Sequence, residues 1–290
     1  MRARERSLRA RLCLRRISLR SDPIYNLLFS INRGYIPHFK TALNSLLKNN
    51  EDKSFRLFLM SSDLEESDFS EILSSFRGRN VSIEKLDVDE KIFEGFPTVK
   101  RYPFTIYYRL IAPLLLPEEV EKILYLDSDL IVHGDISRLY DISFEDRYYF
   151  IGCTQIGKLL TGINVIRLDA KDNAVYLNTG VMMMNVKELR HAVNVAEIRE
   201  YVTKRKALLV LYDQDIVCRF FGDKVKLVDP YVFNLPDRRV TASVILQNDD
   251  VDPDWVEKNN LIIHYLGKNK PWKDNYRGHL KNYYLMYKMQ

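Results

Sequence analysis

The sequence is poor in cysteine and contains no long apolar run. Its 290 residues include only Cys13, Cys153 and Cys218, which are odd in number, far apart and without the spacing of metal ligands. This pattern excludes a disulfide framework and is typical of a reducing compartment. The longest apolar candidate, residues 110–117, is interrupted by Pro113 and is far shorter than the about 18 residues of a membrane-spanning helix.

Glycine is also scarce, with 11 residues in the chain. No glycine-rich phosphate loop follows the first expected strand, where the sequence reads Asn32-Arg33-Gly34. A nucleotidyltransferase that holds a triphosphate in such a loop is therefore disfavoured.

The net charge of +5 comes from the two ends of the chain. Residues 1–20 carry eight Arg and one Glu, and residues 268–290 carry six basic residues against Asp274. The part between them is acidic, whereas a nucleic-acid-binding domain needs a basic face. We therefore expect no nucleic-acid partner.

Residues 1–22 are predicted to be a disordered basic tail, because they are rich in Arg and lack a sustained apolar stretch. Two explanations stay open for residues 1–20. They are either translated from a start codon placed too far upstream, or they form a basic arm that contacts anionic lipid.

The pattern after the tail predicts alternating strands and helices. We expect strands at residues 25–30, 55–60 and 81–86, with helices after Pro37 and over residues 69–76. The first helix has an apolar stripe at the spacing of one helical face; its members are Phe39, Ala42, Leu43, Leu46 and Leu47. This order predicts an α/β fold whose sheet is parallel with right-handed crossovers.

The most informative stretch is Lys122–Val132, an apolar run that contains Asp127 and Asp129. The run predicts a buried strand that ends at the first carboxylate. Residues i and i+2 of an extended segment point to one side, and ligands of open α/β sheets bind beyond the carboxyl ends of the strands. The pair indicates a divalent-cation site that also holds phosphates, although a solvated Asp-Ser-Asp turn is the simpler alternative.

Four further segments combine apolar runs with isolated polar residues. A helix is expected over residues 104–116, where Arg109 either pairs with a carboxylate or phosphate or reaches solvent. Residues 175–185 are strand-like, and the glycine of Asn178-Thr179-Gly180 indicates either close approach to the backbone or a bulge. The chain from Val132 to Asp169 shows no regular pattern.

Asp213-Gln214-Asp215 precedes a predicted helix and either caps it or presents polar groups into a cleft. Asp215 fits the capping role better than its two neighbours do. His264 ends an apolar stretch and is either structural or a metal ligand.

Taken together, these segments resemble glycosyltransferase family 8, which includes glycogenins and bacterial lipopolysaccharide galactosyl- and glucosyltransferases. The resemblance covers about residues 24–275 and rests on six motifs in order. They are the strand and loop from Phe29 to Tyr35, Tyr108-Arg109-Leu110, Leu124 to Asp129, Leu177 to Val181, Asp213 to Ile216, and His264 to Trp272. It implies a GT-A fold, a Rossmann-like, mostly parallel sheet flanked by helices, over residues 23–275.

The resemblance also implies roles for individual residues. Asp127, Asp129 and His264 match the family's metal ligands, and this mixed N/O set suits Mn²⁺ better than Mg²⁺. Donor-binding roles fall on the uracil-stacking Tyr35, the ribose contact Ser128, the diphosphate contacts Gly267 and Lys270, and the sugar-lining Arg109, Asn178, Asp213 and Gln214. Gly180 also falls among the donor-binding residues. Asn32 stands where relatives often have an acid, and Gln155 replaces another.

The implied activity is retaining transfer of glucose or galactose from UDP-glucose or UDP-galactose to a cell-envelope glycan or glycolipid. Asp213 and Gln214 are the catalytic candidates. Gln214 is a poor nucleophile, so attack on the front face of the sugar is expected, with the departing phosphate taking the acceptor proton. The alternative is a catalytically silent relative that binds a sugar nucleotide or glycan. The protein is expected in the cytoplasm, with contact at the inner face of the membrane.

The C-terminal segment, residues 276–290, combines basic residues with tyrosines. This composition suits a membrane interface. It equally suits an ordinary amphipathic helix that packs on the domain.

Overall fold

The computed structural model describes residues 23–98, 103–246 and 251–289. The predicted tail, residues 1–22, lies outside this part of the chain. Among the residues described, no helix is long and apolar enough to cross a membrane.

The N-terminal part is the predicted succession of parallel strands and helices. Strand β1 (Ile24–Ser30) pairs in parallel with β2 (Ser54–Ser61), and β2 pairs in parallel with β3 (Val81–Asp87). Helix α2 (Ile36–Lys48) carries Pro37 in its first turn, and α3 (Glu66–Ser75) is followed by Gly78 at a φ of +78°. These strands and helices confirm the sequence prediction. The apolar side chains of the two helices pack against the sheet.

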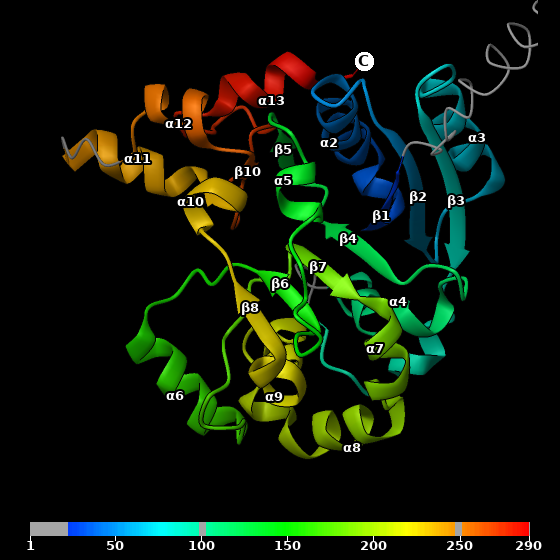
Figure 1. The fold of residues 1–290 in the computed structure, drawn as a ribbon, viewed down its shortest axis with the longest axis vertical. Coiled ribbons are helices and arrows are strands. Elements are labelled where there is room, and N and C mark those ends of the chain that lie inside the picture. The colour runs from blue at the N-terminus through cyan, green and yellow to red at the C-terminus, as the bar shows by residue number, and fades with distance from the viewer. Residues whose placement is uncertain (1–22, 99–102, 247–250, 290) are drawn as a thin grey trace, which may run out of the picture.

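Strand β4 (Lys122–Leu126) lies on the other side of β1 and is parallel to it. The seven-stranded sheet has the order β3-β2-β1-β4-β7-β6-β8 (Figure 1). Its remaining strands are β6 (Phe150–Gly152), β7 (Val181–Asn185) and β8 (Val225–Leu227). Only β7 runs antiparallel to its neighbours, so the sheet is mostly parallel, as predicted.

A second sheet brings the last motif to the end of β4. It has the order β5-β10-β9, with β5 (Leu130–Val132), β9 (Leu235–Pro236) and β10 (Ile262–His264). In the β5–β10 pair His264 lies opposite Leu130, and the Tyr265 amide donates to the Asp129 carbonyl over 2.9 Å. Backbone pairing therefore fixes the imidazole beside the two carboxylates.

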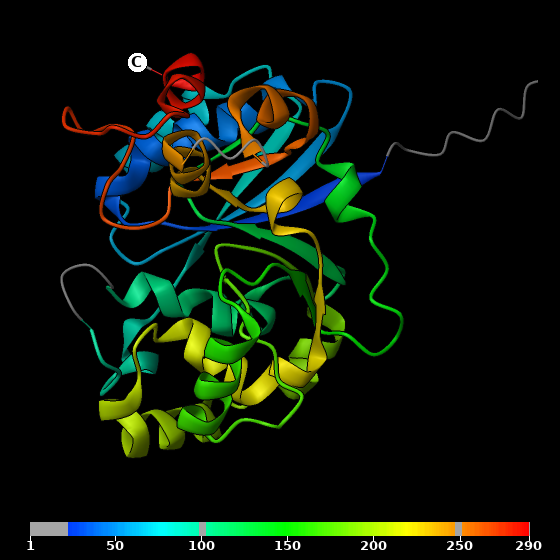
Figure 2. The same ribbon diagram turned by 90° about the vertical axis from the view of Figure 1, so that its left-hand side faces the viewer.

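Helices cover both faces of the main sheet (Figure 2). Helix α4 (Tyr108–Leu115) follows a 3₁₀ turn at Phe104–Tyr107, so the helix predicted over residues 104–116 is present in two pieces. The other helices are α5 (Ser137–Tyr140), α6 (Lys158–Leu168), α7 (Val186–Ala192), α8 (Val195–Arg205), α9 (Asp213–Phe221), α10 (Pro230–Phe233), α11 (Asp237–Leu246), α12 (Pro253–Asn259) and α13 (Lys281–Tyr287). Further 3₁₀ turns lie at Arg33–Tyr35, Glu90–Phe93, Lys206–Leu208 and Gly222–Lys224.

The pattern missed one helix and misplaced the start of one strand. The stretch from Val132 to Asp169, which is less regular in sequence, contains β6 and the eleven-residue helix α6. Helix α6 has apolar residues around most of its circumference, so it gives no single stripe. Residues 175–178 are a loop rather than the start of a strand, although their apolar side chains are buried or half-buried against the core.

Alternating side chains of the central strands fill two cores. Phe58, Tyr125 and Met182 lie in one core, while Leu57, Leu124 and Met183 lie in the other. The run Met182–Met184 is thus core, as its composition indicated. Such alternation is what a strand covered on both faces produces.

The tyrosines of the C-terminal helix belong to a third core beneath the second sheet. The Tyr284 hydroxyl lies 2.9 Å from His38 Nδ1, and the Tyr287 hydroxyl accepts from Asn49 Nδ2 over 2.9 Å. Both rings are buried. These contacts favour α13 as a helix that packs on the domain.

Candidate metal and donor site

Three side chains predicted to hold a metal converge at the carboxyl end of β4. One ligand atom from each of Asp127, Asp129 and His264 lies within 4.8 Å of the others. His264 Nε2 is 3.1 Å from Asp129 Oδ1 and 3.8 Å from Asp127 Oδ2. The two carboxylates therefore face one point with an imidazole nitrogen beside them.

Gly180 makes room for this group. Its carbonyl accepts from the Asp127 amide over 2.8 Å, so the two backbones touch. A Cβ at Gly180 would lie 2.4 Å from His264 Cε1 and 2.5 Å from Asp127 Oδ2. The groups that lie close to the backbone at Asn178-Thr179-Gly180 are thus the side chains of two metal-ligand candidates, Asp127 and His264.

A chain of amides fixes the tautomer of His264. Asn178 Oδ1 accepts from the Gly180 amide over 3.3 Å, so this atom is the oxygen, and Asn234 Nδ2 donates to it over 3.0 Å. Asn234 Oδ1 then lies 2.8 Å from His264 Nδ1, which must carry the proton. Nε2 is therefore the ring nitrogen that faces the carboxylates.

This arrangement fits a divalent cation. In a neutral imidazole protonated at Nδ1, Nε2 is an acceptor like the Asp129 carboxylate 3.1 Å away, so a cation placed between them would satisfy both groups. A metal-bound imidazole usually donates its other N–H to an oxygen, as His264 does to Asn234. Two carboxylates and an imidazole are donors that Mn²⁺ accepts readily.

Arg109 lies on the core side of the same group. Its guanidinium donates to Asp127 Oδ1 over 3.0 Å and to the Thr179 carbonyl over 2.7 Å, and it lies 4.2 Å above the centre of the Tyr125 ring. Burial opposes its charge, but Asp127 and Asp213 outweigh burial and raise the pKa of Arg109 above its ordinary value. The isolated arginine is therefore a buried partner of carboxylates.

Asp213 is the second carboxylate on this arginine. Its Oδ2 lies 3.4 Å from Arg109 Nε and accepts from the Thr179 hydroxyl over 2.6 Å. The Nε contact does not meet hydrogen-bond geometry, so Thr179 supplies the better-directed bond. Burial raises the pKa of Asp213, and Arg109 works against that rise.

Helix α9 presents Asp213 and Gln214 at its first turn. Tyr212, just before the helix, has a φ of 34°, a strained backbone of the kind that occurs at functional sites. Asp215 points inward and accepts from the amides of Val210 and Leu211 over 2.6 and 3.1 Å. Asp215 therefore has a structural role, although it bonds the loop before α9 rather than capping the helix, whereas Gln214 is half-buried at the helix start.

Lys270 lies on the opposite side, in the loop after β10. Its ammonium group contacts Asp129 Oδ2 and donates to the Tyr265 carbonyl over 2.8 Å. Burial acts to raise the pKa of Asp129. The neighbouring Lys270 and His264 have a larger, opposite effect, so the pKa lies below its usual range. The loop turns at Gly267, whose φ of +97° favours glycine.

The residues expected to contact the nucleoside lie around this loop. Trp272 stacks on His38 with 3.5 Å between ring centres, and Tyr35 lies edge-on, 6.1 Å from Trp272. Tyr35 is 38% exposed, so its ring can receive a base. Asn32 precedes it at the 3₁₀ turn. Ser128 is buried, and its hydroxyl has no partner among the residues described.

Sequence reasoning missed the role of Asn234. It lies 30 residues from His264 and 56 from Asn178, and nothing local in its sequence links it to either. Gln155 donates from Nε2 to the Asn234 carbonyl over 2.7 Å, which places this residue behind the metal-ligand candidates. Asn178, expected to line the donor sugar, has its oxygen turned toward Gly180 and Asn234.

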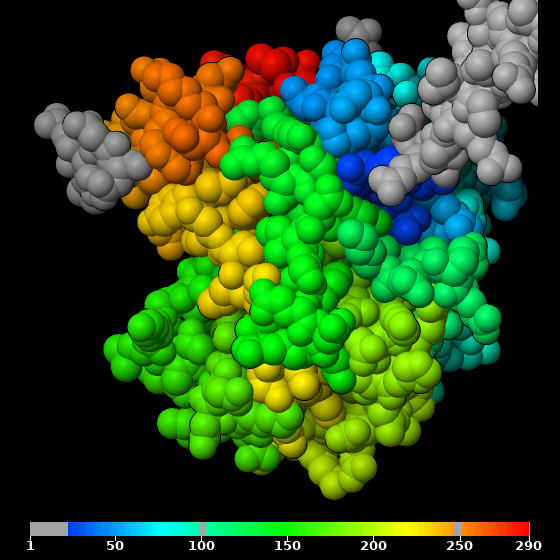
Figure 3. Space-filling model, viewed as in Figure 1, coloured from blue at the N-terminus to red at the C-terminus, as the bar shows by residue number. Residues whose placement is uncertain are grey.

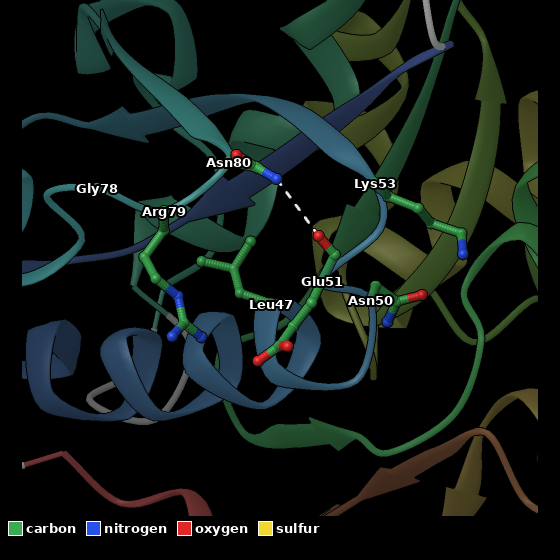
Figure 4. Close-up of a pocket in the computed structure, with 7 residues that line it drawn as sticks. All are labelled: Leu47, Asn50, Glu51, Lys53, Gly78, Arg79 and Asn80. Carbon is green, nitrogen blue, oxygen red and sulfur yellow. Dashed lines mark hydrogen bonds between the residues drawn. The ribbon is translucent and has the colours of Figure 1, made fainter.

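One pocket lies far from these residues in the fold. It encloses about 230 Å³ and is lined by residues near the amino ends of β2 and β3 (Figure 4). These ends are opposite the carboxyl ends of the strands, where the candidate site lies. Its polar residues are Asn50, Glu51, Lys53, Arg79 and Asn80, and Asn80 Nδ2 donates to the Glu51 carbonyl over 3.3 Å. None of the predicted site residues lines it.

Comparison with known proteins agrees with this geometry. The sequence model of glycosyl transferase family 8 matches residues 26–276. Lipopolysaccharide 1,2-glucosyltransferase of Escherichia coli is 25% identical over 265 residues, 90% of this chain and 76% of that protein. Lipopolysaccharide 1,3-galactosyltransferase of Salmonella typhimurium is 23% identical over 255 residues, 86% of this chain and 73% of that protein.

The fold is also that of a solved relative. The crystal structure of the galactosyltransferase LgtC in complex with donor and acceptor sugar analogs superposes with a TM-score of 0.75 and 22% identity. The match covers 90% of this chain and 94% of that chain. Since the family match extends from β1 through the Lys270 loop, the protein belongs to glycosyl transferase family 8 and is a glycosyltransferase with a GT-A fold.

Proposed function

We propose that the protein is a retaining, Mn²⁺-dependent hexosyltransferase that moves glucose or galactose from a UDP-sugar to a cell-envelope glycan or glycolipid. The observation that carries the proposal is the convergence of Asp127, Asp129 and His264, whose Nδ1 is held by Asn234 so that Nε2 faces the carboxylates. Relatives named for glucosyl and for galactosyl transfer support both sugars equally.

The same geometry supports a diphosphate as the leaving group. Bound between Asp127, Asp129 and His264, Mn²⁺ would stabilise the charge of the diphosphate as a Lewis acid. Lys270 lies on the Asp129 side and can donate to a diphosphate oxygen, where charge grows as the sugar departs. The turn at Gly267 places this lysine over the site.

The residues near the sugar argue against a covalent intermediate. A double displacement needs a carboxylate free to attack the anomeric carbon, and Gln214 is an amide. Asp213 is buried and held by Thr179 and Arg109. In our proposal the acceptor oxygen attacks from the face that UDP leaves. The bond to the anomeric carbon forms as the sugar–phosphate bond breaks, the electron pair leaves with UDP, and a phosphate oxygen takes the acceptor proton.

The assignment of the nucleoside end of the donor rests on Tyr35 and Asn32. Tyr35 is positioned to stack on uracil, and Asn32 offers an amide where many relatives offer a carboxylate. An amide can bond either the uracil edge or the ribose. We therefore infer UDP as the nucleotide from the whole set of motifs rather than from Asn32 alone.

UDP release from a panel of UDP-sugars, with and without Mn²⁺, tests the proposal. We expect slow hydrolysis of UDP-glucose or UDP-galactose, loss of activity with a chelator, and recovery with added Mn²⁺. Asp129→Asn should lower the rate by about 10²–10³-fold, because it removes a charged ligand. Asp141→Asn, at an exposed aspartate after α5, is the matched control and should retain the wild-type rate.

Binding measurements on the same samples separate the alternatives. A protein that binds UDP-sugar but releases no UDP, even with added glycan or glycolipid acceptors, would be a silent relative. Absence of binding in the presence of Mn²⁺ would contradict the donor assignment itself. A covalent glycosyl group trapped on Asp213 would contradict front-face attack.

A further inference from the structure

Helix α6 exposes an apolar face that no other part of the described structure covers. Leu159 and Ile166 are 79% and 83% exposed, and Leu160 and Ile163 are about half exposed. These positions follow the spacing i, i+1, i+4 and i+7, so they form one stripe along the helix. Within the described residues, no other helix exposes more than two large apolar side chains.

The exposure does not come from a loosely attached helix. Val165 and Leu168, on the opposite side of α6, are buried in the core. Arg167 extends from α6 to α9 and donates to Asp215 Oδ1 over 2.7 Å. The helix is therefore anchored on one side, while its other apolar side faces outward.

The basic residue of α6 beside the stripe is Lys158, which is exposed, and the helix contains no acidic residue. Arg167, the other basic residue of α6, is paired with the buried Asp215. Arg167 also contacts the carbonyl of Leu208, which brings exposed Leu208 and Val210 next to the end of α6, with Lys206 beside them. Asp169, the first acid after the helix, lies 3.9 Å from Arg219.

The stripe is connected to the candidate site. Gln155, which bonds the Asn234 carbonyl behind His264, is two residues before Gly157, the N-cap of α6. At the other end, Arg167 holds Asp215, the neighbour of Gln214. In Figure 1, α6 and α11 project from the same side of the molecule, and Figure 3 shows a notch in the outline between them. Helix α11 carries exposed Val244 and Ile245.

We propose that the outward face of α6, formed by Leu159, Leu160, Ile163 and Ile166, binds the headgroup–acyl boundary of an anionic lipid bilayer. A helix that exposes an apolar face can lie in the plane of the interface, and basic residues beside it are attracted to anionic lipid. The match between an acid-free apolar helix and a negatively charged apolar boundary carries the assignment.

The size of the face argues against a second copy of the chain as its partner. An eleven-residue helix is about 16 Å long and 10–12 Å wide. Its single exposed face is much smaller than the about 800 Å² per partner that a stable protein interface buries. Insertion into a bilayer has no such minimum area.

Such binding would present the mouth of the site to acceptors carried in the membrane. This consequence rests on the proposed function, whereas the binding itself does not. The two can therefore be measured separately, by vesicle binding and by UDP release.

Co-sedimentation with phosphatidylglycerol-containing vesicles tests the proposal, with pure phosphatidylcholine vesicles as the neutral reference. The test variant combines Leu159→Ser, Ile163→Ser and Ile166→Ser. The matched control combines Leu285→Ser and Met286→Ser, at the exposed apolar pair of α13. We expect wild type and control to bind anionic vesicles alike and the α6 variant to bind at least about tenfold more weakly.

UDP release and thermal melting should be the same for all three proteins, because the replaced side chains face outward. Three results would overturn the inference. They are wild type that ignores anionic vesicles, an α6 variant that binds like wild type, and a control that loses binding in place of the α6 variant. Wild type that dimerises through α6 without binding vesicles would assign the face to a second copy instead. Failure of UDP release with intact vesicle binding would concern the proposed function alone.

Discussion

Arg109 and Lys270 supply the positive charges on the two sides of the site, and they differ in almost every other respect. Arg109 comes from helix α4, is 6% exposed and contacts Asp127, Asp213 and the Thr179 carbonyl. Lys270 comes from a loop that turns at Gly267, and it contacts Asp129 and the Tyr265 carbonyl.

The difference separates a structural charge from a functional one. A buried arginine between two carboxylates offsets their negative charge whether or not substrate is present. A lysine on a loop can move from one partner to another as a phosphate arrives, since its ammonium group is a compact charge on a flexible stem. The comparison therefore predicts that replacing Arg109 lowers the stability of the fold, whereas replacing Lys270 lowers the rate of turnover.

The largest effect is expected from Arg109→Met. Removing the guanidinium leaves the Asp127 and Asp213 carboxylates without their shared partner, which should cost about 3–5 kcal/mol of unfolding free energy. Thermal melting should fall by about 10 °C. Arg147→Met, at an exposed arginine, is the control and should melt like wild type. An Arg109→Met protein as stable as wild type would contradict the structural role of Arg109.

Lys270→Met should act on turnover with little effect on the fold. We expect kcat to fall by about 10²–10³-fold, because a donor to the leaving phosphate is lost. Melting should change far less than in Arg109→Met, since His264 still faces Asp129. Steady-state kinetics and melting curves on the same sample check both parts. Equal losses of stability in the two variants would show that the loop lysine is structural as well.

Asn234→Leu tests the support behind the metal ligands. It removes the acceptor that holds the Nδ1 proton of His264, so Mn²⁺ affinity should fall by about 10–100-fold. Calorimetric titration with Mn²⁺ measures the change. Asn164→Leu, on the half-exposed side of α6, is a control that does not touch this chain of amides. Unchanged affinity would mean that another group orients the imidazole.

The smallest effect concerns His38, which packs against the Lys270 loop through Trp272. Burial lowers the pKa of His38 from 6.5 to about 4. The unfolded chain therefore binds this proton first, and stability should decline as pH falls from about 6.5 to 4. In His38→Phe the decline should be shallower, by about 2–4 °C of melting temperature, because the ring is only partly buried. Parallel curves for the two proteins over this range would contradict it.

Local patterns predicted the part of the fold that local packing controls. Pro37 and the stripe from Phe39 to Leu47 specified α2, and the apolar run before Asp127 specified β4. Helix α6 escaped prediction because Val165 and Leu168 face the core while Leu159 and Ile166 face outward. A helix with apolar residues on both sides has no amphipathic stripe to detect.

The sequence alone determined which residues could hold a metal, because Asp127 and Asp129 are two positions apart at a strand end and Gly180 keeps their neighbourhood open. The tertiary structure decided how those residues are held. The tautomer of His264 depends on Asn234 and Asn178, which come from loops far apart in the chain. Such contacts depend on how strands of separate sheets are placed, and no local pattern of residues encodes that placement.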